Sequence, residues 1–492
     1  MTRKRTILRL NILLAICFST ITICAQQLNF ERTYGLPGYN YGKRVLQTED
    51  NGYLILGNKS GFTGSSDIYL IKTGTLGKLV WDKAIGNASI EVAEDMKPTF
   101  DKGYIIAGYS NYGANNDYQL LLIKIDSLYN VEWLKNFGGT NWDFGYSVVQ
   151  SPDSGFIVAG ETYSYGNGAN DVFILKTDLN GNKLWHKAYG GQNEDVAMCI
   201  VNSDTNYLLT GYTNSFGNGQ YDCYVLCFDA SGDTLWTRTF GDSLDDKAFS
   251  IMHTNDKNII IAGSTENYGA VKIDGLIIKI DSMGNQIWTN KHGGQEDDQF
   301  FHCLMEPNND MLFTGYTESF GYDKKDVYLV LSDNYGNFKE TNTFGRAKND
   351  NANSIINTSD NAYALIGSTT SLGIGESNIY FIKTDSLLQI DNNTYSHELN
   401  ILEIEDEDFF QICLFPNPSD GKFSIISKKL NIKNAVLEVY DVNGRKVYDK
   451  SEIYLNPNSL LNFEISHLNN GFYFIKILNN DYSIIRKLII KK

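Results

Sequence analysis

The chain has 492 residues, with 42 Lys or Arg and 58 Asp or Glu, and its formal net charge is −16 at pH 7. This negative charge argues against nucleic acid as a partner and against binding an anionic membrane through charge alone. The chain is long enough to bury hydrophobic cores without disulfide bonds, and its seven cysteines show no paired spacing.

The first 25 residues have the three parts of a secretory signal peptide. "MTRKRTILR" is basic, "LNILLAICFSTITICA" is apolar but too short to span a membrane, and "AQQ" places a small residue before a polar one. We predict cleavage after Ala25 and no transmembrane segment in the rest of the chain. Cleavage removes Cys17 and Cys24, and we interpret the five remaining cysteines as buried apolar residues.

From the leader to about residue 390 the chain consists of repeats. "DLNGNKLWHKAYGG", residues 178–191, has counterparts upstream and downstream at steps of 51 or 52 residues. Each copy has a Gly near its end, and most have a Trp five residues before it. The Trp series is Trp81, Trp133, Trp185, Trp236 and Trp288, and the Gly series is Gly35, Gly86, Gly138, Gly190, Gly241, Gly293 and Gly345. This regular period identifies a repeat protein.

Each copy predicts four strands. Copy three reads "YSVVQSP", "GFIVAGETY", "DVFILKTD" and "KLWHKAYGG", joined by turns. The middle two strands are nearly continuous apolar runs, which indicates a small sheet covered on both faces, as in the blades of a β-propeller. An open solenoid is the alternative repeat architecture.

The ends of the repeat region favour the propeller. "LNFERTYG" at 28–35 matches a fourth strand, whereas the last copy stops before its own fourth strand. We predict that the N-terminal segment completes the last blade and closes the ring. The fold class we expect is all-β, with a seven-bladed β-propeller over residues 26–390.

Two recurring residues have structural explanations. We predict positive φ for the turn glycines Gly77, Gly181, Gly232, Gly284 and Gly336. Copy two has Tyr129 at this position, which predicts a different turn. We interpret the Trp series as packing between blades, so Glu340 and Asn392, which replace Trp in copies six and seven, predict the two weakest blades.

Beyond the repeats the composition changes. Residues 391–410 are polar and then strongly acidic, as expected of a linker. Residues 411–492 contain short strands that alternate apolar and polar residues between turns such as "PNPSDG" and "DVNG". This pattern predicts a small antiparallel β-sandwich.

The repeat pattern of Trp, "YGG", Asp and "LKTD" resembles the bacterial SBBP-type β-propeller repeat over residues 28 to about 390. "KTDLNGNKLW" is also similar in outline to the tryptophan motif of quinoprotein dehydrogenases. Those enzymes use a quinone held by a Trp and a vicinal disulfide, and no adjacent cysteine pair exists in this chain. The quinone and its calcium are therefore not carried over, and we expect no cofactor.

The C-terminal block resembles the type A sorting domain of type IX secretion. The matching residues are Pro416, Asn417, Pro418, Gly421, Asp441, Gly444, Arg445, Gly471, Tyr473, Lys491 and Lys492. The resemblance implies export through the periplasm, recognition by an outer-membrane translocon and removal of the block by a cell-surface protease. The product is then released or attached to surface lipopolysaccharide.

One repeat position carries an acid or amide five residues after the repeat Gly. It holds Asn40, Glu91, Asp143, Asp195, Asp246, Asp298 and Asp350. In a propeller these side chains surround one mouth of the channel, but blades about 10 Å apart cannot place all of them on one Ca²⁺. We interpret them as acceptors for amides of their own turns, and we predict no metal site.

The residue before this position is Tyr39, Ile90 and Trp142 in the first three copies and acidic or amide in the others. Trp142 stands outside the Trp repeat register, so either it folds over its own loop or it contacts a ligand. We hypothesise a ligand site with Trp142 as anchor, Tyr39 and Tyr165 beside it, and Tyr112 and Tyr163 in the accompanying loops.

Two functions remain open. The first is a secreted or surface-displayed scaffold that binds a glycan or protein, with no catalytic residues. The second is a secreted enzyme acting on glycans, a lyase or hydrolase, which needs acids, bases or histidines that break the repeat pattern on one face. His186, His253, His292 and His302 fall at unrelated repeat positions, and no nucleophile or zinc motif occurs.

Overall fold

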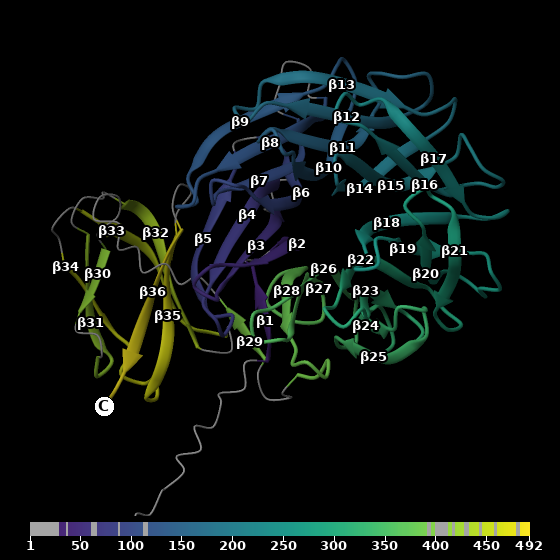
Figure 1. Ribbon diagram of the computed structural model, residues 1–492. Helices are drawn as coiled ribbons and strands as arrows, with labels where there is room; N and C mark the ends of the chain where they lie inside the picture. Colours follow the sequence, from purple (N-terminus) through teal and green to yellow (C-terminus); the bar gives the residue numbers. More distant parts are fainter. Residues whose placement is uncertain are drawn as a thin grey trace, which may run out of the picture.

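The computed structural model describes residues 29–35, 38–60, 66–86, 89–111, 117–390, 395–398, 412–415, 419–427, 432–441, 445–456, 460–478 and 483–492. Every regular element in these ranges is a β-strand (Figure 1). The predicted signal peptide and most of the predicted linker lie outside the described residues.

Within the described residues from Phe30 to Glu398 the strands form seven sheets, which we call blades 1 to 7. Blades 1 and 2 are β2 to β5 (Tyr39–Gln47, Tyr53–Ser60, Ser66–Thr73, Leu79–Ile85) and β6 to β9 (Glu91–Pro98, Tyr104–Ser110, Gln119–Ile125, Val131–Phe137). Blades 3 and 4 are β10 to β13 (Asp143–Gln150, Phe156–Thr162, Asp171–Thr177, Lys183–Tyr189) and β14 to β17 (Asp195–Ser203, Asn206–Thr213, Asp222–Phe228, Thr234–Phe240). Blades 5 and 6 are β18 to β21 (Asp246–His253, Ile259–Thr265, Asp274–Ile280, Gln286–His292) and β22 to β25 (Asp298–Met305, Met311–Thr317, Asp326–Ser332, Phe338–Phe344). Blade 7 is β26 to β28 (Asp350–Asn357, Tyr363–Thr369, Asn378–Lys383) with β1 (Phe30–Tyr34) and β29 (Ser396–Glu398).

The blades form a closed ring. The first strand of each blade lies at the centre, where it contacts the first strands of both neighbouring blades, and β26 of blade 7 contacts β2 of blade 1 (Figure 1). The chain is therefore a β-propeller, as the repeat pattern predicts.

The N-terminal strand completes the last blade. β1 pairs antiparallel with β28, and Phe30 lies opposite Lys383 while Tyr34 lies opposite Ile379. This pairing confirms the predicted ring closure. In addition, β29 pairs in parallel with the outer edge of β1, so three residues of the predicted linker extend blade 7.

The apolar middle strands are buried on both faces. Every residue of β11 and β12 is buried, and Ile157 and Ala159 of blade 3 share a core with Leu209 and Leu226 of blade 4. Burial of both faces explains why these strands lack an apolar–polar alternation. Four cysteines in the described residues are free and buried, namely Cys199, Cys223, Cys227 and Cys303. The side chain of Cys413 lies outside the described part.

The repeat Trp side chains pack directly against the turn glycines. A Cβ on Gly181 would lie 2.8 Å from the indole of Trp133, and a Cβ on Gly232 would lie 3.0 Å from the indole of Trp185. Each half-buried Trp therefore packs against the turn of the next blade. These glycines also have positive φ, for example 71° at Gly181, as predicted.

The prediction that copy two has a different turn at Tyr129 is wrong. Tyr129 has φ 65° and its amide donates to Asp126, as the amide of Gly181 donates to Asp178, so its turn has the same form. Tyr129 offsets the strain by packing on Trp81, with ring centroids 5.0 Å apart.

Other apolar side chains fill the space that the missing Trp residues leave in blades 6 and 7, and the lower stability that Glu340 and Asn392 predict for these blades stays a prediction. Glu340 is exposed, and Leu388, 1% exposed with φ 59°, fills the junction of blades 6 and 7. In blade 7 the Trp position is taken by Phe30, which lies against Gly77. Asn392 lies outside the described residues.

The C-terminal block has its own core. Its strands are β30 to β36, namely Ile412–Phe415, Lys422–Ser427, Ile432–Asp441, Lys446–Leu455, Leu460–Glu464, Gly471–Leu478 and Ser483–Ile490. They form a three-stranded and a four-stranded antiparallel sheet. Phe423 and Ile425 of one sheet share a buried cluster with Leu437, Val439 and Ile475 of the other, as expected of a β-sandwich.

Candidate functional site

The predicted ring of acids is buried in its turns. The seven side chains from Asn40 to Asp350 are each at most 2% exposed. Asp143 accepts the Gly139 amide at 2.8 Å and the Ser164 hydroxyl at 2.7 Å, and Asp195 accepts the Gly191 amide at 2.8 Å in the next blade. These carboxylates hold the loop between one blade and the next.

A second carboxyl group, from the third strand of a blade, lies beside a carboxyl group of this ring at the repeat Gly. A Cβ on Gly345 would lie 2.1 Å from Oδ1 of Asp326 and 2.6 Å from Oδ2 of Asp350. The repeat Gly is required because the two carboxyl groups occupy the space that a side chain needs. Burial and, to a smaller extent, the charge of Asp350 raise the pKa of Asp326 to about 6, although the hydrogen bond from the Tyr322 amide and the charge of Arg346 act in the opposite direction.

We expect Asp326→Asn to stabilise the protein above pH 6. Because the folded state raises the pKa of Asp326 above its unfolded value, ionisation costs folding free energy above about pH 6, and this cost disappears as the pH falls toward 4. The last blade already has Asn378 at this position, buried and hydrogen-bonded to its own loop. The variant should melt a few degrees higher than the wild type at pH 7.5, and the gain should shrink at pH 4.5. A lower melting temperature at pH 7.5 would contradict this account.

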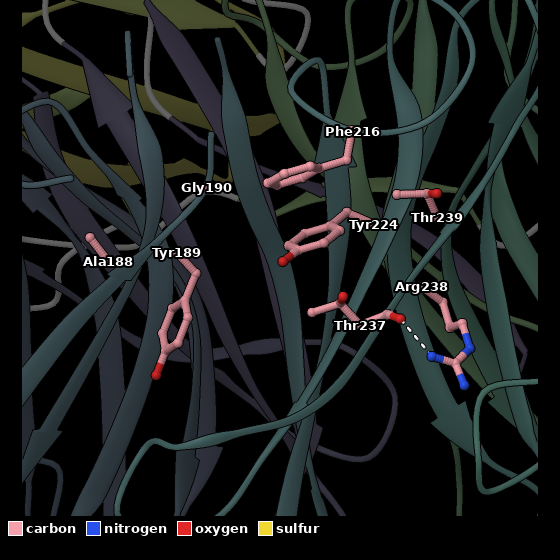
Figure 2. Close-up of a pocket in the computed structure, with 8 residues that line it drawn as sticks. All are labelled: Ala188, Tyr189, Gly190, Phe216, Tyr224, Thr237, Arg238 and Thr239. Atoms are coloured by element: carbon pink, nitrogen blue, oxygen red, sulfur yellow. Dashed lines mark hydrogen bonds between the residues drawn. The ribbon is translucent and has the colours of Figure 1, made fainter. Parts of the chain in front are cut away.

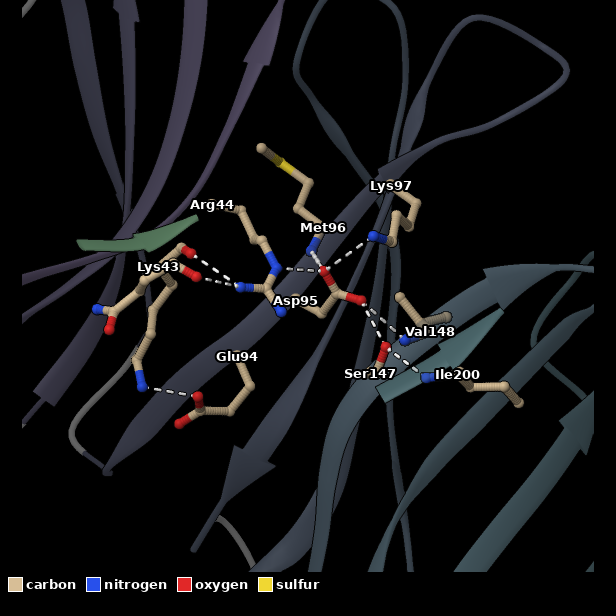
Figure 3. A network of polar contacts seen from close by, with 10 residues as sticks. Lys43, Arg44, Glu94, Asp95, Met96, Lys97, Ser147, Val148 and Ile200 are labelled. Atoms are coloured by element: carbon tan, nitrogen blue, oxygen red, sulfur yellow. Dashed lines mark hydrogen bonds and ion pairs between the residues drawn. The ribbon is translucent and has the colours of Figure 1, made fainter. Parts of the chain in front are cut away.

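A polar belt crosses the centre of the ring nine residues after each repeat Gly, and Figure 3 shows part of it. Its members are Arg44, Asp95, Ser147, Cys199, Ser250, His302 and Ser354. Arg44 Nε donates to Asp95 at 2.7 Å, and Asp95 accepts the Ser147 hydroxyl at 2.9 Å and the Val148 amide at 3.1 Å.

The belt links one blade to the next. Ser147 accepts the amide of Ile200, and Ser250 accepts the amide of Cys303, each at 3.3 Å. In these blades the hydroxyl of the belt serine accepts a hydrogen bond from a backbone amide on the innermost strand of the next blade. Burial raises the pKa of Asp95, but Lys97 and Arg44 outweigh it, so the pKa lies below its usual range. The belt was not predicted from the sequence, although its constant spacing is visible in the repeats.

Trp142 lies in a cluster of aromatic side chains at one mouth of the ring. Trp142 is 48% exposed, and its ring centroid lies 5.9 Å from that of Tyr163, 6.0 Å from that of Tyr118 and 6.4 Å from that of Phe144. The loops before β10 and after β11 are joined, because the amide of Tyr163 donates to the carbonyl of Trp142 at 2.8 Å. The structure thus brings Trp142 and Tyr163 together.

The other predicted site tyrosines lie in different surroundings. Tyr165 donates to the Gly138 carbonyl, and its ring contacts Phe173 and His186. Tyr39 is 48% exposed and stacks on Tyr41. Neither has a ring contact with Trp142 in the described part of the chain, and Tyr112 lies outside that part.

Cavities at this mouth are lined by alternate residues of the inner strands. One of about 490 Å³ is bordered by Tyr41, Lys43, Glu94, Asn351 and other polar side chains, and one of about 310 Å³ shares Glu94 and Tyr109 with it. These residues could not be singled out in the sequence because they alternate with buried ones, as in any half-buried strand.

A larger cavity of about 630 Å³ lies between the outer strands of blades 3 and 4 (Figure 2). Phe216 stacks on Tyr224 above it, and the small side chains Thr237 and Thr239 leave the space open. In blade 3, His186 stands at the position of Thr237 and fills the equivalent space beneath Tyr165. Arg238 at its edge is engaged with backbone carbonyls, including that of Met283.

One carboxyl group near the mouth is held in the acid form more strongly than usual. Burial raises the pKa of Glu161, which accepts hydrogen bonds from Tyr146 and Asn170. The four histidines of the repeats are far from forming one group: for example His186 packs on Tyr165, while His253 bonds the Asn202 carbonyl. Among the described residues no group of three or more His, Cys, Asp or Glu side chains is arranged to hold a metal ion.

In the C-terminal sandwich the predicted motif residues have structural roles where they are described. Gly421 has φ 103°, and a Cβ there would lie 2.7 Å from the Ser466 backbone. The Tyr473 hydroxyl donates to the Asn469 carbonyl at 3.0 Å, and the Lys491 amide donates to Ser419 at 2.8 Å. Pro416, Asn417, Pro418 and Gly444 lie outside the described residues.

The comparisons with known proteins agree with this division. Residues 413–491 match the family described as the secretion system C-terminal sorting domain. The chain is similar to the regulatory protein FlaEY of Caulobacter vibrioides, with 25% identity over 220 residues, which are 39% of this chain and 22% of that protein. The chain thus spans less than a quarter of FlaEY.

Solved structures are similar at low identity. Puromycin hydrolase matches with a TM-score of 0.46 and 10% identity over 79% of this chain and 59% of that chain. The β-propeller domain of the Trilobed protease from Pyrococcus furiosus matches with a TM-score of 0.41 and 9% identity over 73% of this chain and 98% of that chain. Scores at this level carry no information about activity.

None of the elements in the described ranges is a helix long and apolar enough to cross a membrane. The sorting-domain match directs the chain to secretion or to attachment at the cell surface. The chain is a β-propeller that carries a C-terminal sorting domain of type IX secretion.

Proposed function

We propose that this protein is a secreted or surface-displayed binding scaffold whose ligand, a glycan or a protein, docks at the mouth of the ring around Trp142. The observation that carries the proposal is the aromatic cluster around Trp142, which stays 48% exposed although its ring packs against Tyr163 and Phe144, because contiguous exposed apolar surface marks interaction sites. Tyr163 stands beside it and extends the apolar surface, and Tyr39 is exposed in blade 1.

The repeats support a scaffold. Acids at the recurring ring position accept hydrogen bonds from turn amides, as Asp143 and Asp195 do, and the belt carboxylate Asp95 pairs with Arg44. Binding surfaces of propellers arise from loops that vary while such structural positions repeat. The route we propose is cleavage after Ala25, passage through the periplasm, and recognition of residues 411–492 by the translocon and the sorting protease.

The proposal is tested by comparing how well the wild type and matched variants capture the ligand. We expect Trp142→Ala to weaken binding by at least about 2 kcal/mol, the usual mark of a hot spot, with little change in melting temperature. A glycan array and a pull-down from the surface fraction of the producing cells give the readout. Leu184→Ala, an exposed apolar position on outer strand β13, is the control. Unchanged binding by Trp142→Ala, or loss of binding only together with global unfolding, would move the site elsewhere.

One observation favours an enzyme as the second candidate. Glu161 has a raised pKa and a bond from Tyr146, and Glu94 lines the adjacent cavity, so a proton donor and a carboxylate stand near one mouth. Release of reducing ends or unsaturated sugars from a polysaccharide by the wild type, and its loss in Glu161→Gln, would establish a glycan hydrolase or lyase instead of a scaffold.

A further inference from the structure

The cavity of about 310 Å³ at the mouth has an unusual lining. Four of its six residues are aromatic, one is an acid and one is Met, and they come from blades 2, 3 and 4. They are Glu94, Tyr109, Phe144, Tyr146, Met198 and Tyr212. A space of this size accepts a small organic group.

The aromatic rings stand at different angles to one another. The rings of Tyr109 and Phe144 meet edge to face, with centroids 4.9 Å apart and planes at 82°. The rings of Phe144 and Tyr146 are parallel, with centroids 6.1 Å apart. Rings at such angles present both faces and edges to one space, as in the cages that hold ammonium groups by cation–π attraction.

The electrostatic surroundings favour a cation. Glu94 lines the cavity, and its Oε2 forms an ion pair with Lys43 Nζ at 2.6 Å. Burial raises the pKa of Tyr109, Tyr146 and Tyr212, and neighbouring carboxylates add to each shift, from Glu94 for Tyr109 and from Glu161 for the other two. The phenols therefore stay neutral in a negative environment, and the whole chain has a net charge of −16.

The same face already holds ammonium groups of this chain. Lys325 Nζ lies 3.7 Å from the ring centroid of Tyr316, which has the same place in blade 6 as Tyr212 in blade 4. Lys247 Nζ lies 4.2 Å from the centroid of Tyr221 and 5.4 Å from that of Tyr212. In the described part of the chain no Lys or Arg lies over Tyr109, Phe144 or Tyr146.

We propose that this cavity is an aromatic cage for a methylated ammonium group, with Tyr109, Phe144 and Tyr146 supplying the rings and Glu94 the charge. The inference rests on the proposed function, because the cage opens on the same mouth, where Phe144 also contacts Trp142. It names the chemistry of one part of the ligand. A small molecule such as choline and a trimethylated lysine side chain both carry this group.

The test compares choline with its neutral isostere 3,3-dimethylbutanol on the purified full-length protein by calorimetry. We expect choline to bind at least about tenfold more tightly than the isostere, because only the cation is attracted by the ring faces. Phe144→Leu should weaken choline binding at least about tenfold. Phe301→Leu, on inner strand β22 at the opposite side of the ring, should leave it unchanged. A peptide with trimethyllysine, assayed beside choline, shows which source is preferred.

The outcomes separate this inference from the proposed function. Equal affinity for the isostere, no choline binding, or equal effects of Phe144→Leu and Phe301→Leu overturns the cage, and Trp142-dependent capture in those cases leaves the proposed function intact. Choline binding lost only in Phe144→Leu, with an unchanged melting temperature, supports the cage. Choline binding without Trp142-dependent capture supports the cage and removes the proposed function.

Discussion

Deleting residues 28–35 should lower the melting temperature by at least about 10 °C and make the protein aggregate. The deletion removes β1, exposes the edge of β28 and eliminates five paired positions whose hydrogen bonds contribute about 1 kcal/mol each. It also removes Phe30 and Tyr34, which are 2% and 1% exposed, and large buried side chains of this kind contribute about 3–5 kcal/mol each. Differential scanning calorimetry and light scattering provide the measurement.

A point variant keeps this prediction testable if the deletion fails to fold. Phe30→Ala leaves the pairing of β1 in place but removes the ring that packs on the turn at Gly77. It should melt clearly below the wild type, whereas Val80→Ala, at an exposed position of outer strand β5, should not. If the deletion and Phe30→Ala both melt like the wild type, β1 does not close the ring in solution.

Ending the chain at residue 410 should leave a folded propeller that is not exported. The sorting domain has a hydrophobic core of its own, and in the described residues none of its strands pairs with a propeller strand. The truncated chain retains β29 and should therefore melt like the intact propeller, yet it lacks the part that the translocon recognises.

Fractionation of the producing cells with an immunoblot gives the readout. We expect the truncated chain in the periplasm, and the full chain with Trp142→Ala, as a control, at the surface or in the medium. Truncated protein in the medium at the normal level would contradict the sorting assignment.

The parts of the fold that repeat in sequence could be predicted from it. The match of residues 28–35 to a fourth strand predicts the pairing of β1 with β28, because only a closed ring explains a surplus strand at one end and a missing one at the other. Turn glycines such as Gly181 and the packing of Trp133 also follow from the repeat, since one supersecondary unit has the same requirements in every copy.

The departures from the repeat pattern could not be predicted because the side chains that compensate for them belong to a neighbouring blade. Tyr129 tolerates a turn that favours Gly because Trp81 of the neighbouring blade packs on it. Leu388 fills a junction where Glu340 leaves no apolar side chain. A copy read by itself shows the departure but not the compensation.

The candidate site was predicted only in part. The position of Trp142 outside the Trp repeat register marked it in the sequence, and in the structure Tyr163 contacts it. Tyr165 has the spacing of a loop residue but packs on Phe173 and His186. The cavity of the cage is lined by residues of three successive blades, and their alternation with buried residues is the ordinary pattern of a strand.

The most direct test of a ligand site at this mouth is a hydrogen-exchange footprint of the full-length protein with and without its captured ligand. Protection of the loops around residues 139–142 and 163–166, and of the start of β10, is the result that we predict. Protection confined to the opposite ends of the blades, such as the turns at 99–103 and 151–155, with no change around Trp142, would contradict it.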